Sequence, residues 1–200
     1  MYEMLHFHVI NLERGVAIMK KKILVVVDMQ NDFTTGCLGN AECIAAIDGV
    51  KEVLASEVYD EYIFTLDTHG ENYMETMEGS KLPVPHCIKG TEGHAIVDGL
   101  VQLAKEKSSN VNCFEKITFG STGLAEYFAK NVAGDDYGKD VQIDFVGVCT
   151  GICVISNVML TKAVCPEATI RVISKGCACV TPDSHKTALD AMAMCHIEIV

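Results

Sequence analysis

The segment GVCTGICV, residues 147–154, decides the fold, because a buried strand passes into a helix there. The residues that lead into it, 141–148, read as a strand inside a sheet. Nearer the N-terminus, the run ILVVV at 23–27 is apolar throughout, and Asp28 follows it directly. Continuous rather than alternating apolar runs are typical of parallel strands covered on both faces. These segments therefore predict the interior of a parallel sheet.

Strand and helix patterns alternate along the rest of the chain. No repeats, low-complexity tracts or linkers interrupt the alternation, which is typical of a single α/β domain. We therefore predict an α/β fold, a three-layer αβα sandwich around a mainly parallel central sheet of about six strands. The further strands are expected at 61–66, 111–116, 169–174 and 195–200, and the helices at 41–57, 94–107, 121–132, from Gly151 to about 164, and from near Pro182 onward.

The domain is expected to span residues 19–200. Residues 1–18 show neither the organisation of a signal peptide nor a clean amphipathic helix. By contrast, Met19 and the three lysines after it, followed by ILVVVD, look like an ordinary protein start. Our hypothesis is that residues 1–18 are an N-terminal extension outside the domain, as a misassigned start codon would produce.

The composition favours a cytoplasmic protein that acts on a small molecule. A formal charge of −11 argues against a nucleic-acid partner, because phosphate binding needs a basic surface. No apolar run approaches the roughly 20 residues that cross a bilayer, so no membrane partner is expected. The ten cysteines are scattered through a chain without a secretory signal. This predicts reduced thiols rather than disulfides, and we interpret nine of them as small core residues.

Several chemically active residues fall at the carboxyl ends of the predicted strands. Asp28 ends the strand at 23–27, Asp67 follows the strand at 61–66, and Lys116 ends the strand at 111–116. Ligands of parallel α/β sheets bind outside these strand ends. We therefore expect these three residues to meet the turn at 149–153 on one rim of the sheet.

Cys153 is the candidate nucleophile in that turn. A thiol in the first turn of a helix feels the positive end of the helix dipole, which favours the thiolate. The free N–H groups of the same turn can hold an oxyanion as an acyl intermediate forms. The alternative is that Cys153 is merely a buried helix residue, and on this turn alone Cys149 fits the nucleophile nearly as well.

Asp28 and Lys116 are the candidate partners of the thiol. Asp28 can accept the thiol proton and pass it to a leaving amine, and apolar neighbours suit it to that task by raising its pKa. Lys116 can stabilise the thiolate and hold Asp28 in place. Taken singly, each residue has a simpler interpretation, because Asp28 fits a loop-capping aspartate and Lys116 a solvated lysine.

The aperiodic stretch 68–93 carries a candidate metal site. A loop of this length inside a compact domain is usually functional. Two imidazoles and two carboxylates in and beside it form a plausible set for zinc, iron or manganese. The alternative is a loop whose histidines are satisfied by hydrogen bonds. The residues concerned are Asp67, His69, Glu78 and His86.

Five motifs in this order resemble the isochorismatase-like cysteine hydrolases, and among them most the nicotinamidases. The resemblance runs from about residue 22 to the C-terminus. The motifs are VVVDMQNDF at 25–33, LDTH at 66–69, PHCIKGTEG at 85–93, EKITFGST at 115–122 and GVCTGICV at 147–154.

The resemblance implies a role for each of the candidate residues. Asp28 would be the catalytic acid and base, Lys116 its charged partner and Cys153 the nucleophile. A cis peptide before Cys149 would let the N–H groups of Cys149 and Cys153 bind the oxyanion. The family's metal ligands match Asp67, His69 and His86, and Glu78 matches a fourth ligand of some members. They would bind one divalent ion, with zinc expected and iron or manganese as alternatives.

The sequence also departs from the nicotinamidase pattern. Many members have Thr-Asp-Tyr-Cys or Thr-Asp-His-Cys at the nucleophile, where this chain has Gly151 and Ile152 before Cys153. Many place an aromatic residue three positions before the last metal histidine, where this chain has Pro83. Phe33 remains as the candidate that stacks on the substrate ring.

From these observations we predict hydrolysis of nicotinamide to nicotinate and ammonia through a thioester on Cys153. One alternative is a related hydrolase that acts on another small amide or on isochorismate. The other is an inactive relative that serves as a binding subunit. Members of the family are often oligomeric, so a homo-oligomer is compatible with the sequence.

Overall fold

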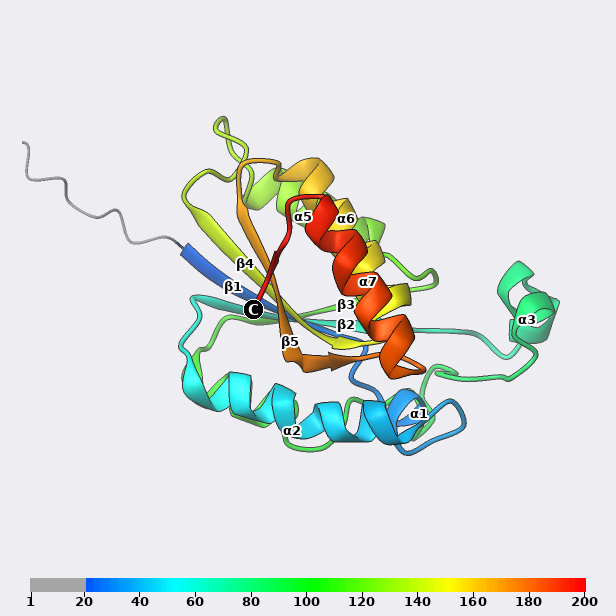
Figure 1. Ribbon diagram of the computed structural model, residues 1–200. Coiled ribbons are helices and arrows are strands. Elements are labelled where there is room, and N and C mark those ends of the chain that lie inside the picture. Colours follow the sequence, from blue (N-terminus) through cyan, green and yellow to red (C-terminus); the bar gives the residue numbers. More distant parts are fainter. Residues whose placement is uncertain (1–20) are drawn as a thin grey trace, which may run out of the picture.

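The computed structural model describes residues 21–200, which form a six-stranded sheet with helices on both faces (Figure 1). All strand pairs are parallel, and the strand order is β3-β2-β1-β4-β5-β6. The predicted three-layer α/β architecture is therefore confirmed. The strands are β1 (Lys21–Val27), β2 (Glu61–Asp67), β3 (Val111–Lys116), β4 (Val141–Val148), β5 (Thr169–Ala178) and β6 (Glu198–Ile199).

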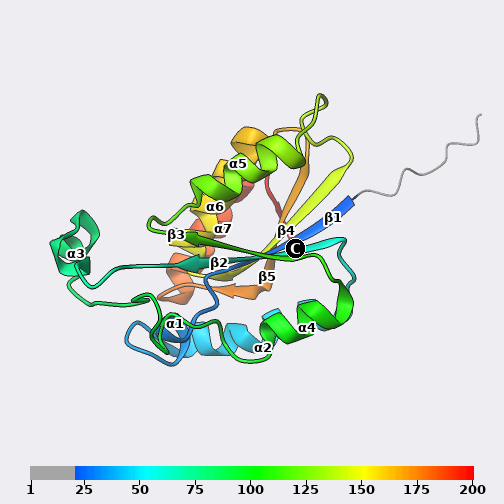
Figure 2. The same ribbon diagram turned by 180° about the vertical axis from the view of Figure 1, so that it is seen from behind.

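The helices form one layer on each face of the sheet (Figures 1 and 2). On one face lie α1 (Asn31–Thr34), α2 (Ala41–Ser56) and α4 (Leu100–Lys107). On the other lie α5 (Thr122–Asn131), α6 (Ile155–Val164) and α7 (Pro182–Met194).

The predicted extension, residues 1–18, lies outside the described residues. None of the helices in residues 21–200 has the length and apolar character that crossing a bilayer requires.

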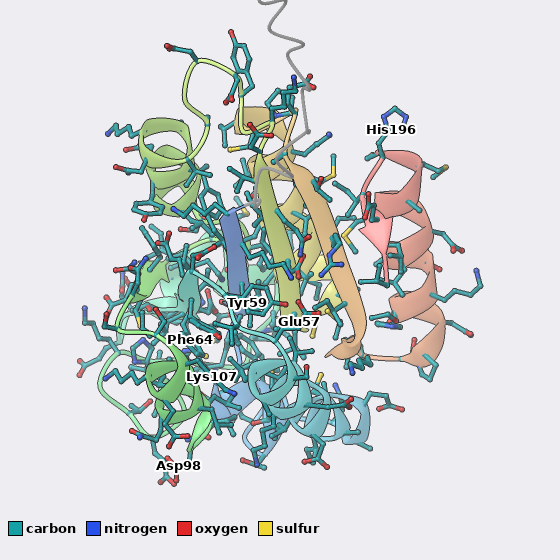
Figure 3. The ribbon with its side chains drawn as sticks, turned by 90° about the vertical axis from the view of Figure 1, so that its left-hand side faces the viewer. Glu57, Tyr59, Phe64, Asp98, Lys107 and His196 are labelled. Atoms are coloured by element: carbon teal, nitrogen blue, oxygen red, sulfur yellow. The ribbon has the colours of Figure 1, made fainter. Side chains whose placement is uncertain are left out.

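Two hydrophobic cores result, because successive side chains of a strand point to opposite faces. In β1, Val25 packs into the core beneath α5, α6 and α7, whereas Leu24 and Val26 pack into the core beneath α2 and α4. Tyr59 and Phe64 belong to the second core, and Figure 3 shows both on the side of the sheet that α2 and α4 cover. The continuous apolar run of β1 is thus explained by helices on both sides.

Three predicted boundaries were wrong. The strand expected to end at 174 continues to Ala178, because a register shift in β4 lets Gly147 pair with Cys177. The helix expected from 94 begins at Leu100, after Gly99 adopts a positive φ of 85°. The last strand is confined to Glu198–Ile199.

The stretch 68–93, expected to lack regular structure, contains a 3₁₀ turn (Tyr73–Glu75) and the short helix α3 (Met77–Lys81). The Thr76 hydroxyl caps α3 by accepting a hydrogen bond from the N–H of Gly79 at 3.0 Å. Two extended segments carry α3 away from the sheet, beyond the carboxyl ends of the strands (Figures 1 and 2). The chain therefore builds an arm over the rim where the candidate residues lie.

All ten cysteines are free thiols, as predicted. The interpretation of nine of them as core residues was wrong for Cys37, Cys113 and Cys195, which are exposed. Cys149 is half-buried, and the remaining six are buried. Apolar neighbours in the sequence do not show which side of an element a thiol occupies, and this explains the error.

The close packing of α2 against β5 gives a testable prediction. Replacing a helix glycine by alanine usually stabilises a protein by about 0.5–1 kcal/mol. At Gly49 of α2 a Cβ would lie 1.9 Å from the carbonyl oxygen of Lys175. We therefore expect Gly49→Ala to lower the free energy of unfolding, by about 1–3 kcal/mol as for overpacked cores. Urea denaturation measures this difference.

Gly123→Ala in α5 is the matched control, because the nearest atom to its Cβ would be 3.8 Å away. Its unfolding free energy should be unchanged or slightly raised. If the two variants have the same stability, the close approach of α2 to β5 is contradicted.

Candidate active site

Asp28, Lys116 and Cys153 meet at the carboxyl ends of the strands, as the sequence predicted. Asp28 follows β1, Lys116 ends β3, and Cys153 lies in a π-helical turn (Thr150–Val154) between β4 and α6. The Nζ of Lys116 lies 2.6 Å from Oδ2 of Asp28 and 3.8 Å from Sγ of Cys153. All three side chains are almost completely buried. The lysine thus contacts both the acid and the thiol.

Asp28 is fixed in place by its neighbour on β2. The hydroxyl of Thr65 donates to Oδ1 of Asp28 at 2.6 Å, and the backbone N–H of Asp28 donates to the Thr65 carbonyl at 3.2 Å. Its Oδ2 is the one buried side-chain oxygen or nitrogen in residues 21–200 without a hydrogen-bond partner of good geometry. Burial raises the pKa of this carboxyl, against the opposing charge of Lys116. Asp28 therefore has a free lone pair and the basicity that proton transfer requires.

The Cys153 thiol differs from the expected thiolate. Burial, and then the negative charge of Asp28, raise the pKa of this thiol well above its ordinary value, although Lys116 acts in the opposite direction. This direction is opposite to the one expected from the helix dipole. Desolvation outweighs the dipole here because the thiol is buried beside a carboxylate. Cys153 needs a base to become nucleophilic, and Asp28 is the adjacent one.

The turn before the nucleophile has the backbone that the family resemblance implied. The peptide bond between Val148 and Cys149 is cis. The carbonyl of Cys149 accepts hydrogen bonds from the N–H groups of Ile152 at 3.0 Å and Val154 at 3.1 Å. These bonds hold the backbone on both sides of Cys153 in a single turn.

Four potential metal ligands gather beside this triad. One ligand atom from each of Asp67, His69, Glu78 and His86 lies within 4.8 Å of all the others. Oδ2 of Asp67 is 2.9 Å from Nε2 of His69 and 3.4 Å from Nε2 of His86. Two imidazole nitrogens and two carboxylate oxygens suit zinc, iron or manganese. The donor set therefore fits one divalent ion.

The surroundings of the histidines support this interpretation. Nδ1 of His86 lies 2.8 Å from the carbonyl oxygen of Val84. When the N–H of Nδ1 donates to that carbonyl, Nε2 carries no proton and points its lone pair at the cluster. Histidines that bind metals commonly use this arrangement. Burial and the negative charge of Asp67 raise the pKa of Glu78. Carboxylates crowded in this way are stabilised by a cation.

Two positioning residues were missed by the sequence analysis. Gln30 is fully buried, accepts from the N–H of Asp67 at 2.7 Å and donates to the Asp67 carbonyl at 2.9 Å. It thus fixes the backbone of a candidate metal ligand, while Thr65 fixes Asp28. The signal for Gln30 was a polar residue three positions after a buried strand. Thr65 gave none, because a threonine inside a strand is ordinary.

A cavity of about 460 Å³ opens over Cys153 and the metal-ligand cluster. Phe33, the candidate ring-stacking residue, lines it, with its ring centroid 5.5 Å from that of His86 in an edge-on arrangement. Pro83 is absent from its lining. The other apolar walls come from residues that the sequence analysis did not single out, namely Leu38, Leu82, Phe119, Ile152 and Val180.

Comparison with known proteins gives consistent matches over nearly the whole chain. The family model of the isochorismatase domain matches residues 22–200. The nicotinamidase/pyrazinamidase of Mycobacterium tuberculosis is 27% identical over 191 residues, which cover 90% of this chain and 98% of that protein.

Two solved structures show the same fold. The nicotinamidase/pyrazinamidase PncA of Bacillus subtilis superposes with a TM-score of 0.73 at 22% identity, covering 90% of this chain and 99% of the other. The pyrazinamidase of Pyrococcus horikoshii in complex with zinc has a TM-score of 0.69 at 22% identity, covering 90% and 98% of the two chains. At these identities the likeness establishes the fold alone.

The raised pKa of Cys153 predicts slow alkylation at neutral pH. Iodoacetamide reacts with the thiolate, so its rate at Cys153 in chelator-treated protein should rise about tenfold per pH unit between pH 7 and pH 9. Asp28→Asn removes the adjacent negative charge, lowers the pKa of the thiol and should speed alkylation at pH 7. Peptide mass spectrometry measures both rates, with the exposed Cys195 as internal reference. Fast alkylation of wild-type Cys153 at pH 7 would contradict the protonated thiol.

Proposed function

This chain belongs to the isochorismatase family, and from that premise we propose that it is a cysteine-dependent amidohydrolase that converts nicotinamide to nicotinate and ammonia. The observation that carries the proposal is the buried contact of Lys116 with both Asp28 and Cys153. Cys153 also lines a cavity beside a set of potential metal ligands. The nicotinamidase/pyrazinamidase of M. tuberculosis supports the choice of substrate.

In the first half of the reaction, Oδ2 of Asp28 accepts the proton of the Cys153 thiol. The sulfur attacks the carboxamide carbon, and the N–H groups of Cys149 and Cys153 donate to the oxyanion that forms. Lys116 holds Asp28 in place and stabilises the thiolate as it develops. Asp28 then gives the proton to the leaving nitrogen, so that ammonia departs and a thioester remains on Cys153.

In the second half, Asp28 accepts a proton from water as the water attacks the thioester carbon. The carbon–sulfur bond breaks, and the thiolate recovers its proton from Asp28. The second proton of the water stays on the carboxylic acid that forms and is lost to solvent, so that nicotinate is released. Phe33 lines the cavity where it can pack against the pyridine ring. The enzyme thus returns to its starting protonation state.

The cluster of Asp67, His69, Glu78 and His86 is the proposed holder of one divalent ion, which we take to be zinc. When bound, such an ion supplies a Lewis acid that can anchor the pyridine nitrogen. Oδ1 of Asp67 lies 3.3 Å from Nζ of Lys116, so this carboxylate contacts both the proposed metal ligands and the proposed catalytic residues.

Ammonia release tests the activity. We expect the zinc-loaded protein to release ammonia from nicotinamide, and Cys153→Ala to lower kcat by at least about 10³-fold, because the covalent path is lost. Cys195→Ala, at an exposed thiol, should retain wild-type activity. A Cys153→Ala variant with near-full activity would refute the mechanism. A wild-type protein that binds zinc and releases no ammonia would refute the substrate.

Metal binding has its own test, independent of turnover. Chelator-treated protein should bind about one zinc ion per chain by calorimetry. His86→Asn should weaken zinc binding at least tenfold, because it removes one of the proposed ligands. Removing even a residue that only hydrogen-bonds to a ligand typically lowers metal affinity about tenfold or more. His196→Asn is the matched control, since His196 is exposed at the far end of α7 (Figure 3). Equal zinc affinity in both variants would contradict the metal site. It would favour the alternative in which the histidines only form hydrogen bonds within the loop.

A further inference from the structure

The cavity over Cys153 is larger than nicotinamide needs. Nicotinamide has nine non-hydrogen atoms, which take up about 270 Å³ even at the roughly 30 Å³ that each water occupies in the liquid. The cavity measures about 460 Å³. Even with nicotinamide bound, a substantial part of this volume remains free.

A second cavity adjoins the first under the α3 arm. This neighbouring cavity measures about 680 Å³ and shares three wall residues with the first, namely Glu78, Leu82 and Phe119. Its outer walls include Met77 on α3 and Ile117 in the segment after β3. Leu82 and Phe119 therefore lie on the border between the two cavities.

The second cavity has exposed apolar walls. Met77 is 78% exposed, Ile117 76% and Phe119 47%. Apolar side chains gathered around a hollow often mark a ligand-binding groove, whereas scattered ones need no explanation. Here they gather on the walls of a cavity that borders the one containing Cys153, so an apolar part of a ligand would cover them.

We propose that the site accepts aromatic carboxamides that carry an apolar ring substituent, which passes Leu82 and Phe119 into the second cavity. This inference rests on the proposed amidohydrolase function and specifies its substrate class. The carboxamide would lie at Cys153 and the ring beside Phe33. The substituent would bury Met77 and Ile117, which have no other cover among the described residues.

The test is the rate of ammonia release from nicotinamides substituted at ring carbon 5 or 6 with methyl, propyl or phenyl. We expect kcat/KM for the better propyl isomer to exceed that for nicotinamide about fivefold to tenfold. Partial burial of the three propyl carbons stabilises the bound substrate and transition state by the corresponding free energy. Dissociation constants of the same amides for Cys153→Ala, measured by calorimetry, should follow the same order without turnover.

A matched pair of variants locates the substituent. Met77 and Met194 are each 78% exposed, but Met194 is the last residue of α7 and lines neither cavity. Met77→Gln should lower kcat/KM for the propyl amide about threefold and leave nicotinamide unchanged. Met194→Gln should change neither value.

The outcomes separate this inference from the proposed function. Rapid hydrolysis of nicotinamide with substituted amides at least tenfold slower would overturn the inference and leave the nicotinamidase function standing. Hydrolysis of the propyl amide without hydrolysis of nicotinamide would support the inference and refute the narrower substrate. Equal effects of Met77→Gln and Met194→Gln would overturn the placement in the second cavity.

Discussion

The buried contact between Lys116 and two aspartates is the interaction on which the site depends. Nζ lies 2.6 Å from Asp28 and 3.3 Å from Asp67. A buried ammonium is costly unless carboxylates compensate its charge, and these two carboxylates do so. They hold the pKa of Lys116 above its ordinary value, even though burial alone would lower it. The lysine therefore stays charged and fixes three strand ends relative to one another.

The parallel register of the sheet puts this contact in place. Asp67 and Lys116 are direct partners in the pairing of β2 with β3, and β1 pairs with the other edge of β2. Asp67 then turns its second oxygen, Oδ2, toward the imidazoles of His69 and His86. Despite its burial, hydrogen bonds to these histidines keep the pKa of Asp67 below its ordinary value. One aspartate thus joins Lys116 to the two histidines of the candidate metal site.

Much of this arrangement could be predicted from the sequence, because strand ends are local features. Strand patterns that end at or just before Asp28, Asp67 and Lys116 predicted both the parallel sheet and the convergence of these residues. The protonation of Cys153 could not be predicted, since it depends on burial beside Asp28 and not on the helix that follows. The α3 arm and the wall formed by Phe119 were also missed, because neither hydrophobic periodicity nor residue type distinguishes them from an ordinary loop.

The central claim is that Cys153, activated by Asp28 beside Lys116, becomes acylated during turnover. The most direct measurement is acid quenching of the zinc-loaded protein during hydrolysis of nicotinamide, followed by mass spectrometry of the peptide that contains Cys153. A nicotinoyl group on that peptide, absent from Cys153→Ala, is the predicted result. Turnover at full rate with Cys153 unmodified at every quench time, and undiminished in Cys153→Ala, would contradict the account.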